Sequence, residues 1–307
     1  MLDKSHQGVP PTAITAKGIA ILLSGYDRSL GLSQWLLRLA GAAVAPLTIN
    51  WRSRDLVIAL VRHELGQQFN GALFGWVWAI AGPLVTLVVY LVTFTSAIKL
   101  PVASVQEGRE HYALTIFVGL IVFNLCAEMF YRAPNLLHER AWQIKTSIFP
   151  TEILASILVA RGLTYAGIGV ALLLACELFF RGSIPPSVLM LPLIVVPLVL
   201  FVLGVVWFLA ALGAFARDVG YLMVYIVPVV MFATPVFYRT SDIPQNLQTV
   251  AYFASLAVPI EMMRAVLLGG DFPPLLPSVW FVIFSFLVFR GGFSVFMRYK
   301  GILADVI

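Results

Sequence analysis

The sequence predicts an all-α integral membrane protein, and three observations support this fold class. Only 11% of the 307 residues are charged, against about 25% in soluble domains. Hydrophobic residues make up 60% of the chain, and a soluble fold of this size could not bury so much apolar surface. Apolar stretches long enough to cross a membrane recur along the chain, without the alternation typical of a membrane β-barrel. A water-soluble enzyme, a disordered chain and a nucleic-acid-binding module are therefore excluded.

Residues 1–70 contain no predicted span, and we interpret them as a cytoplasmic N-terminal arm. Within the arm, one face of a helix over residues 54–68 would carry Leu56, Val57, Leu60, Val61 and Leu65. Such a stripe is typical of an amphipathic helix in the membrane interface. Residues 30–46 are also apolar but have Arg38 near their middle. A central charge is costly in a span, so we expect a second interfacial or packed helix there.

Six apolar stretches are long enough to cross the hydrocarbon core, which takes about 20 residues of helix. They are residues 72–98, 113–130, 153–180, 188–215, 219–238 and 275–297. Prolines inside them are tolerated, because neighbouring helices satisfy the freed backbone groups. Residues 71–300 therefore form a predicted transmembrane domain, and residues 301–307 form a cytoplasmic tail.

The distribution of Lys and Arg predicts the orientation of the spans. Thirteen of the 20 basic residues fall before the first span or in the loops and tail on that side, whereas five fall on the opposite side. Cytoplasmic loops are enriched in Lys and Arg. Both termini are therefore predicted to be cytoplasmic, in agreement with an even number of spans.

Residues 243–270 lie between the fifth and sixth predicted spans and contain only short apolar runs. One run, residues 250–260, is interrupted by Pro259, and a second run follows at residues 265–268. Two re-entrant half-helices that dip in from the outer face would fit these lengths, provided that protein covers them. The alternative is an amphipathic hairpin on the membrane surface.

The sequence lacks the motifs of catalysis and of metal or ATP binding. It contains no GxxxxGK[ST] loop, no HExxH pair and no CxxC motif. Glu128 and Glu177 lie near opposite ends of their spans, so no carboxylate pair for acid–base catalysis is evident. We therefore expect no catalytic residue, no metal site and no cofactor in this chain.

Four segments and the C-terminal tail together resemble a known family. They are NWRSRDLVIALVRHELGQQFNGALFGWVWAIAGPLVTLVVYLVTF (50–94), FVGLIVFN (117–124), IKTSIFPTEIL (144–154), FARDVGYLMVYIVPVVMFATPVFY (215–238) and FMRYKGILADVI (296–307). Their order and spacing resemble those of the permease subunits of ATP-binding-cassette (ABC) exporters for polysaccharides, within the type-2 exporters. The tail is similar to that of O-antigen exporters, and the resemblance covers residues 50–307.

The resemblance implies a permease that exports a lipid-linked polysaccharide, with O-antigen as the first candidate, across the bacterial inner membrane. It also implies a homodimer and a separate ATPase subunit that holds ATP and magnesium, so the chain would be a transport subunit and not an enzyme. A capsule or teichoic-acid polymer, or a small lipid or drug, is an alternative substrate. A secondary transporter and an intramembrane lipid-modifying enzyme are alternatives from other classes. The chain shows neither paired broken helices nor converging His or acidic residues to support them.

Aromatic residues in the predicted spans are candidates for a substrate pathway. Tyr221, Tyr225, Pro228 and Phe232 are spaced by four, three and four residues and therefore share one helical face. Sugars present C–H faces that stack on aromatic rings, so such a face could line a path for a polysaccharide. The other candidates are Trp76, Tyr90, Phe94, Phe123 and Phe130. The alternative is aromatic residues that face lipid or pack between helices.

Glu128 and Arg161 are charged residues within adjacent predicted spans, toward the cytoplasmic side. Charges in a membrane are costly unless they are paired or lie in a wet cavity. We therefore expect the two residues to pair or to flank the cytoplasmic entrance of the pathway. Alternatively, Arg161 could bind the pyrophosphate of a lipid-linked substrate.

The resemblance implies that the loop at residues 131–150 docks into the ATPase, with Glu139 and Arg140 as an exposed pair. A permease without its own ATP site must receive force through cytoplasmic contacts, and the interface helix would move with this loop. The alternative is a solvated charged turn. The candidate coupling residues are Arg62, Glu64, Leu136, His138, Glu139 and Arg140.

Overall fold

The computed structural model of the chain describes residues 54–69, 74–93, 109–142, 150–240, 243–244, 248, 251–252, 256–270 and 272–306. The helix predicted over residues 30–46, and Phe94, lie outside these residues. All regular elements in the described part of the chain are helices, as the predicted all-α class requires. They belong to one compact unit, Thr48–Ile307.

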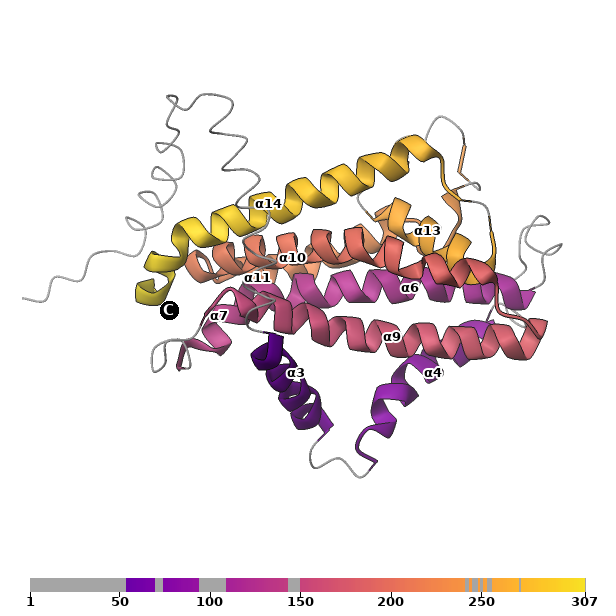
Figure 1. Ribbon diagram of the computed structural model, residues 1–307, viewed down its shortest axis with the longest axis horizontal. Helices are drawn as coiled ribbons and strands as arrows, with labels where there is room; N and C mark the ends of the chain where they lie inside the picture. Colours follow the sequence, from indigo (N-terminus) through magenta and orange to yellow (C-terminus); the bar gives the residue numbers. More distant parts are fainter. Residues whose placement is uncertain are drawn as a thin grey trace, which may run out of the picture. The chain divides into compact units, whose positions relative to one another are not determined.

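The helices follow one another in the predicted order. They are α3 (Arg54–Phe69), α4 (Val77–Val92), α6 (Arg109–Arg132), η2 (Ala133–Asn135), α7 (Leu136–Glu139), α9 (Ile153–Arg181), η3 (Pro186–Met190), α10 (Leu191–Phe215), α11 (Asp218–Ala233), α13 (Ala257–Leu268) and α14 (Leu275–Val306). In Figure 1, α6, α9 and α10 run side by side, and α14 lies along α10. Helices α3 and α4 contact α9.

Within the described residues, four helical stretches are long and apolar enough to cross a membrane. They are Glu110–Glu139, Ile153–Arg181, Pro186–Phe215 and Leu275–Gly301. These stretches correspond to four of the predicted spans and support a multi-pass membrane protein. The first and fifth predicted spans correspond to α4 and α11, which have 16 residues each. At 1.5 Å per residue such a helix measures about 24 Å, less than the ~30 Å hydrocarbon core, so the count of six spans stays a prediction.

The helix of the fifth predicted span ends earlier than expected. We predicted residues 219–238, whereas α11 ends at Ala233. Thr234 has an extended backbone (φ −97°, ψ 143°), and Pro235 follows it. The residue before a proline is disfavoured in the helical conformation, so the helix stops there. Residues 236–240 then form a turn that contacts α6, through the carbonyl of Phe237 at Tyr112 and the side chain of Arg239 at Thr115.

Helix α13 has 12 residues and lies between α11 and α14. We expected Pro259 to interrupt the apolar run, but it lies in the first turn of α13. The backbone N–H groups of a first turn have no partner within the helix, so a proline costs little there. The helix ends at Gly269, whose φ of +74° is readily adopted only by glycine. Residues 243–256 are only partly described, so the pair of half-helices stays a prediction.

A close backbone approach joins α10 and α14. A Cβ atom on Gly204 would lie 2.4 Å from a carbonyl oxygen of α14, and one on Gly292 would lie 1.9 Å from the carbonyl oxygen of Gly204. Small residues allow membrane helices to approach in this way. Nearby, Trp207 packs against Phe289 and Phe293, with ring centroids 5.5 and 5.0 Å apart. This seam is the most extensive contact between two helices in the described part of the chain.

Helix α14 extends beyond the predicted span. We expected the helix to end near residue 297 and a tail to begin at residue 301, whereas α14 continues to Val306. Lys300 Nζ lies 2.6 Å from Glu152 Oε2, and Trp207 Nε1 donates a hydrogen bond to the carbonyl of Glu152 (3.0 Å). These contacts hold the C-terminal part of α14 against α9 and α10.

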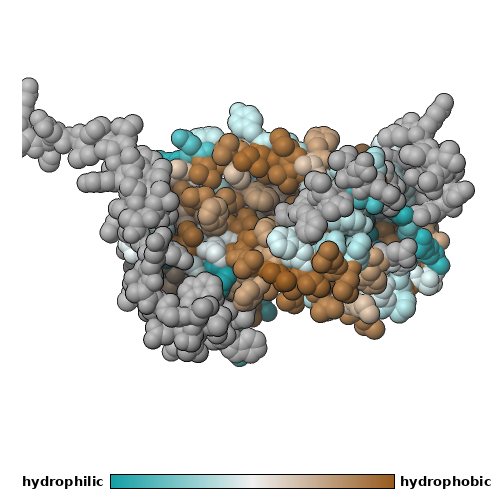
Figure 2. Space-filling model, turned by 90° about the horizontal axis from the view of Figure 1, so that it is seen from above, coloured by the Kyte–Doolittle hydropathy of each residue, from teal (hydrophilic) through white to brown (hydrophobic). Residues whose placement is uncertain are grey.

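Apolar side chains lie on the outside of the helices. Figure 2 shows hydrophobic residues (brown) across the middle of one face, with hydrophilic residues (teal) toward both ends. The most exposed apolar side chains include Leu189, Phe179, Leu275 and Leu193. Soluble proteins rarely expose contiguous apolar surface on this scale, whereas lipid would cover it in a membrane.

Candidate functional site

Two pockets lined by arginines lie beside opposite ends of α6. The first has a volume of about 370 Å³ and lies between α3, α6, α7 and α9; we name it the Arg161 pocket. The second has a volume of about 450 Å³ and lies beside the start of α6 and α13; we name it the Arg264 pocket. In the predicted orientation, the Arg161 pocket faces the cytoplasm and the Arg264 pocket faces outward.

An ion pair between adjacent helices lies at the Arg161 pocket. Arg161 of α9 pairs with Glu128 of α6, and Arg132 Nε lies 3.6 Å from the same carboxylate oxygen. The Arg161 side chain is only 9% exposed, and its Nε has no hydrogen-bond partner in the described part of the chain. Pairing lowers the cost of placing both charges beside apolar spans. The pairing that the sequence analysis considered is present, while a role in transport stays a prediction.

A second ion pair joins α3 to the segment after α7. Arg140 pairs with Glu64 of α3, and both side chains are mostly buried. Burial lowers the pKa of the Arg140 guanidinium from its ordinary value, and the positive charge of Arg161 lowers it further. We expected Glu139 and Arg140 to form an exposed pair. Glu139 is exposed, but Arg140 is not, because it turns inward to the carboxylate of Glu64.

The remaining coupling candidates lie in different surroundings. Leu136 is buried, and His138 Nε2 lies 3.2 Å from the carbonyl oxygen of Gly213 in α10. A Cβ on Gly213 would lie 2.0 Å from the carbonyl oxygen of Pro134, so only glycine lets η2 pack this closely against α10. Arg62 is exposed on α3. Arg62 and Glu139 are therefore the candidates that remain accessible to another protein.

The aromatic pathway candidates do not form one cluster within the chain. Tyr221, Tyr225 and Phe232 of α11 are 73%, 75% and 69% exposed, and Trp76 is also exposed. Phe123 is buried among the helices, where it serves packing. Tyr90 and Phe130 are half-buried. Among the described pathway candidates, the three rings of α11 are thus exposed together, as the spacing of these residues predicted.

A smaller cavity lies between α4, α6 and α9, next to the Arg161 pocket. It has a volume of about 260 Å³, and Glu128 is part of its wall. Thr86, Asn124 and Tyr165 supply further polar groups, while the rest of the wall is apolar or glycine. The cavity thus places apolar surface beside a charged pair.

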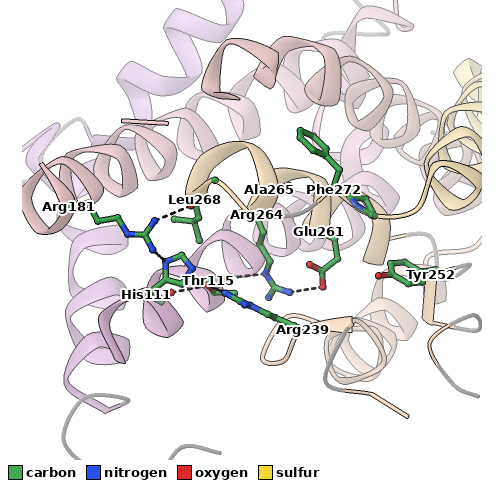
Figure 3. A pocket seen from close by; sticks show the side chains of 13 residues that line it. His111, Thr115, Arg181, Arg239, Tyr252, Glu261, Arg264, Ala265, Leu268 and Phe272 are labelled. Atoms are coloured by element: carbon green, nitrogen blue, oxygen red, sulfur yellow. Dashed lines mark hydrogen bonds and ion pairs between the residues drawn. The ribbon is translucent and has the colours of Figure 1, made fainter. Parts of the chain in front are cut away.

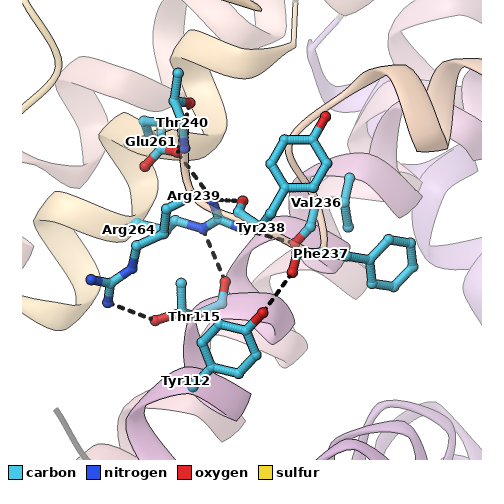
Figure 4. Close-up of polar contacts among 9 residues, drawn as sticks. All are labelled: Tyr112, Thr115, Val236, Phe237, Tyr238, Arg239, Thr240, Glu261 and Arg264. Carbon is cyan, nitrogen blue, oxygen red and sulfur yellow. Dashed lines mark hydrogen bonds and ion pairs between the residues drawn. The ribbon is translucent and has the colours of Figure 1, made fainter. Parts of the chain in front are cut away.

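Arg264 of α13 connects three separate segments (Figure 4). Its Nε donates to the carbonyl of Thr115 on α6 (3.0 Å), and its Nη2 donates to the carbonyl of Val236 (2.8 Å). Its Nη1 donates to the carbonyl of Tyr238 (3.0 Å) and to Glu261 (3.1 Å). Its side chain is only 6% exposed. Burial lowers the pKa of this guanidinium, whereas the negative charge of Glu261 raises it.

The sequence analysis did not single out Arg264. The available signal was the spacing of Glu261 and Arg264 by three residues in an apolar helix, which places them side by side. The carbonyl partners on α6 and after α11 are distant in sequence and have no sequence signature. A further tie is the hydrogen bond from the Tyr112 hydroxyl to the carbonyl of Phe237 (3.0 Å).

In the part of the chain that the structure describes, no three His, Cys, Asp or Glu side chains gather in a way that could hold a metal ion. Cys126 is buried and Cys176 is half-buried, and both are free. The expectations of no catalytic residue and no cofactor stay predictions.

Comparison with known proteins gives a family and several relatives. The sequence model of the family described as "ABC-2 type transporter" matches residues 55–268, which include both ion pairs and Arg264. A relative from Myxococcus xanthus, described as "O-antigen export system permease protein RfbA", is 24% identical over 173 residues. That match covers 56% of this chain and 64% of the relative, just under two thirds of its length. Two relatives with the same description from Klebsiella pneumoniae are each 22% identical over 82% of this chain and 95% of their own length.

Proposed function

Because this chain belongs to the ABC-2 type transporter family, we propose that it is the permease subunit of an ABC transporter that exports a lipid-linked polysaccharide, most specifically O-antigen. The observation that carries the proposal is the similarity to O-antigen export permeases along 95% of their length. The four described helices that are long and apolar enough to cross a membrane fit this role. The chain would lie in the bacterial inner membrane with both termini in the cytoplasm.

In this proposal a separate ATPase subunit supplies the energy, because the sequence has no loop to hold the phosphates of ATP. Arg62 on α3 and Glu139 on α7 are exposed and available for docking. The ion pair between Glu64 and Arg140 ties these two elements together, so a displacement of one is passed to the other. ATP then drives the permease only if the ATP-bound ATPase subunit binds one of the two permease conformations more tightly than the other.

The proposed path for the polysaccharide runs between two copies of the chain. The aromatic face of α11, formed by Tyr221, Tyr225 and Phe232, is exposed in the single chain and would line this path. Rings stack on the C–H faces of sugars without selecting one tight site, so a polymer can slide along them. The same exposure also suits contact with lipid. The two roles differ in the effect of removing the rings, because export should fall only if the rings line the path.

The Arg161 pocket would receive the diphosphate of the lipid carrier. Arg132, Arg140 and Arg161 line it together with Glu64 and Glu139, and guanidinium groups bind phosphate oxygens in bidentate fashion. The unpartnered Nε of Arg161 leaves a donor for such an anion. The adjacent cavity between α4, α6 and α9 offers apolar surface for the start of the lipid chain.

The proposal is tested by surface display of polysaccharide in cells that lack the endogenous gene and receive the chain with its ATPase. Arg161→Gln should lower surface polysaccharide at least tenfold, since a charge-assisted hydrogen bond contributes about 1.5–3 kcal/mol. The double variant Tyr221→Ala/Tyr225→Ala should also lower export. Leu222→Ala, which changes another exposed side chain of α11, should not. Immunoblots must show equal insertion of all variants. Equal display from Arg161→Gln would contradict the diphosphate site, and no display from the wild-type chain would contradict the transport function.

A further inference from the structure

Arginines predominate among the charged side chains that line the Arg264 pocket. Three arginines line it, Arg181, Arg239 and Arg264, and Glu261 is the one carboxylate among its described lining residues. The Glu261 carboxylate already accepts hydrogen bonds from the Thr240 backbone N–H (2.8 Å) and hydroxyl (2.9 Å). Guanidinium groups thus outnumber carboxylates among the described residues that line the pocket. Figure 3 shows the arginines converging from α9, α13 and the turn after α11, beside His111 and Thr115 of α6.

The arginines are held in place by groups around the pocket. Arg181 Nη1 lies 3.0 Å from Glu177 and 3.2 Å from the carbonyl of Leu268, and its Nη2 lies 2.8 Å from Nδ1 of His111. Glu177 itself is buried and does not line the pocket. The Arg181 side chain is nevertheless 43% exposed, so part of it remains accessible. A positioned and partly exposed guanidinium is prepared to bind an anion at a low cost in side-chain entropy.

The position of the pocket along α6 corresponds to the level of lipid phosphates. His111 lines the Arg264 pocket and Arg132 lines the Arg161 pocket. At 1.5 Å per residue, the helix between these two residues is about 32 Å long, which is close to the ~30 Å hydrocarbon thickness of a bilayer. The two pockets therefore lie near the two headgroup levels. The rim of the Arg264 pocket includes the exposed Phe272, which suits the apolar part of a lipid.

We propose that the Arg264 pocket binds the phosphate group of a membrane lipid in the outer leaflet, with Arg181 and Arg239 as its principal ligands. Basic pockets between membrane helices bind phosphate headgroups in this way. Arg264 forms the floor of the site and keeps α13 in place through its carbonyl contacts. The lipid is either an anionic phospholipid of the bilayer or the diphosphate-bearing carrier after export. This inference goes beyond the proposed function, since it holds for either lipid.

The test measures lipid binding to the purified full-length chain by native mass spectrometry, without an ATPase. Phosphatidylglycerol and undecaprenyl diphosphate are added separately, and diacylglycerol, which lacks a phosphate, serves as the neutral lipid. The double variant Arg181→Gln/Arg239→Gln should lose one phosphate-bearing lipid per chain, with at least tenfold weaker affinity at that site. Arg217→Gln/Arg298→Gln, which removes two exposed arginines elsewhere, should bind as the wild type does.

The outcomes distinguish the two phosphate-bearing lipids from each other and from the absence of a phosphate-binding site. A loss confined to undecaprenyl diphosphate identifies the carrier, and a loss confined to phosphatidylglycerol identifies the bilayer lipid. Equal retention of both lipids by the double variant and the wild type would overturn the proposal, as would equally tight binding of diacylglycerol. If the double variant does not fold, Arg181→Gln alone is measured instead. It changes a partly exposed side chain and should weaken binding of the same lipid by a smaller factor. Because export plays no part in this assay, its result is independent of the transport assay.

Discussion

At the scale of single residues, the buried arginines Arg264 and Arg161 differ in the groups that compensate their positive charge. Arg264 is surrounded by backbone carbonyls from α6 and from residues 236–240, with Glu261 as its neighbour. Arg161 instead depends on one carboxylate, Glu128, and keeps an unpartnered Nε. The first arrangement is saturated and suits a fixed structural role. The second arrangement leaves one N–H donor of Arg161 without an acceptor among the described residues, and this donor is available to an anion.

We therefore expect Arg264→Met to destabilise the protein without removing any group that is exposed. The substitution removes the guanidinium donors from three buried carbonyls and the positive charge beside Glu261, which costs about 3 kcal/mol. A loss of that size lowers the Tm by roughly 5 °C in a chain of 307 residues, because the entropy of unfolding is about 2.1 cal/mol/K per residue. Thermal unfolding of the purified chain in detergent measures the effect, and Arg298→Met, at an exposed position of α14, is the matched control. An unchanged Tm for Arg264→Met would contradict this role.

At the scale of elements, contacts at glycines and ion pairs determine which helices move together. The approach of α10 and α14 at Gly204 and Gly292 leaves no space for a side chain, so this pair is expected to move as one body. The connection between α3 and the residue that follows α7 includes instead the ion pair between Glu64 and Arg140. The expected division is a rigid C-terminal seam and an adjustable cytoplasmic contact.

Neighbouring glycines on α14 provide a direct test of the seam. Gly292→Ala would place a Cβ 1.9 Å from the carbonyl oxygen of Gly204, whereas Gly291→Ala meets nothing within 4 Å. Overpacking typically costs about 1–3 kcal/mol, while an alanine in place of an exposed helical glycine gains up to about 1 kcal/mol. We expect Gly292→Ala to lower the Tm and Gly291→Ala to leave it equal or higher. The reverse order would show that α10 and α14 do not pack as described.

The contact between α3 and α7 is tested by exchanging its charges. Glu64→Arg or Arg140→Glu alone places like charges together, and we expect each to reduce the ATP-driven export activity several-fold. The double exchange restores an ion pair with the opposite polarity and should recover much of the activity. Export measured alongside co-purification of the ATPase separates loss of coupling from loss of docking. Failure of the double variant to improve on both single variants would argue against this connection.

At the scale of the whole molecule, composition and helical periodicity were sufficient to predict the class and the order of the helices. The pairing of Glu128 with Arg161 could also be anticipated, because charges in spans demand partners. The inward turn of Arg140 and the burial of Phe123 could not, since both depend on which helices become neighbours. The same holds for Arg264, whose acceptors are backbone carbonyls remote in sequence. The early end of α11 did have a local signal in Pro235, which the hydropathy of the surrounding residues concealed.

The central claim, that this chain is the passage for a lipid-linked polysaccharide, is tested most directly in proteoliposomes. The chain and its ATPase are reconstituted together with a fluorescent lipid-linked oligosaccharide, and a membrane-impermeant quencher reports which leaflet holds the label. The account predicts movement to the leaflet opposite the ATPase that requires ATP hydrolysis and falls at least tenfold with Arg161→Gln. Movement that continues without ATP, or that is equal in liposomes with the ATPase alone, would contradict it.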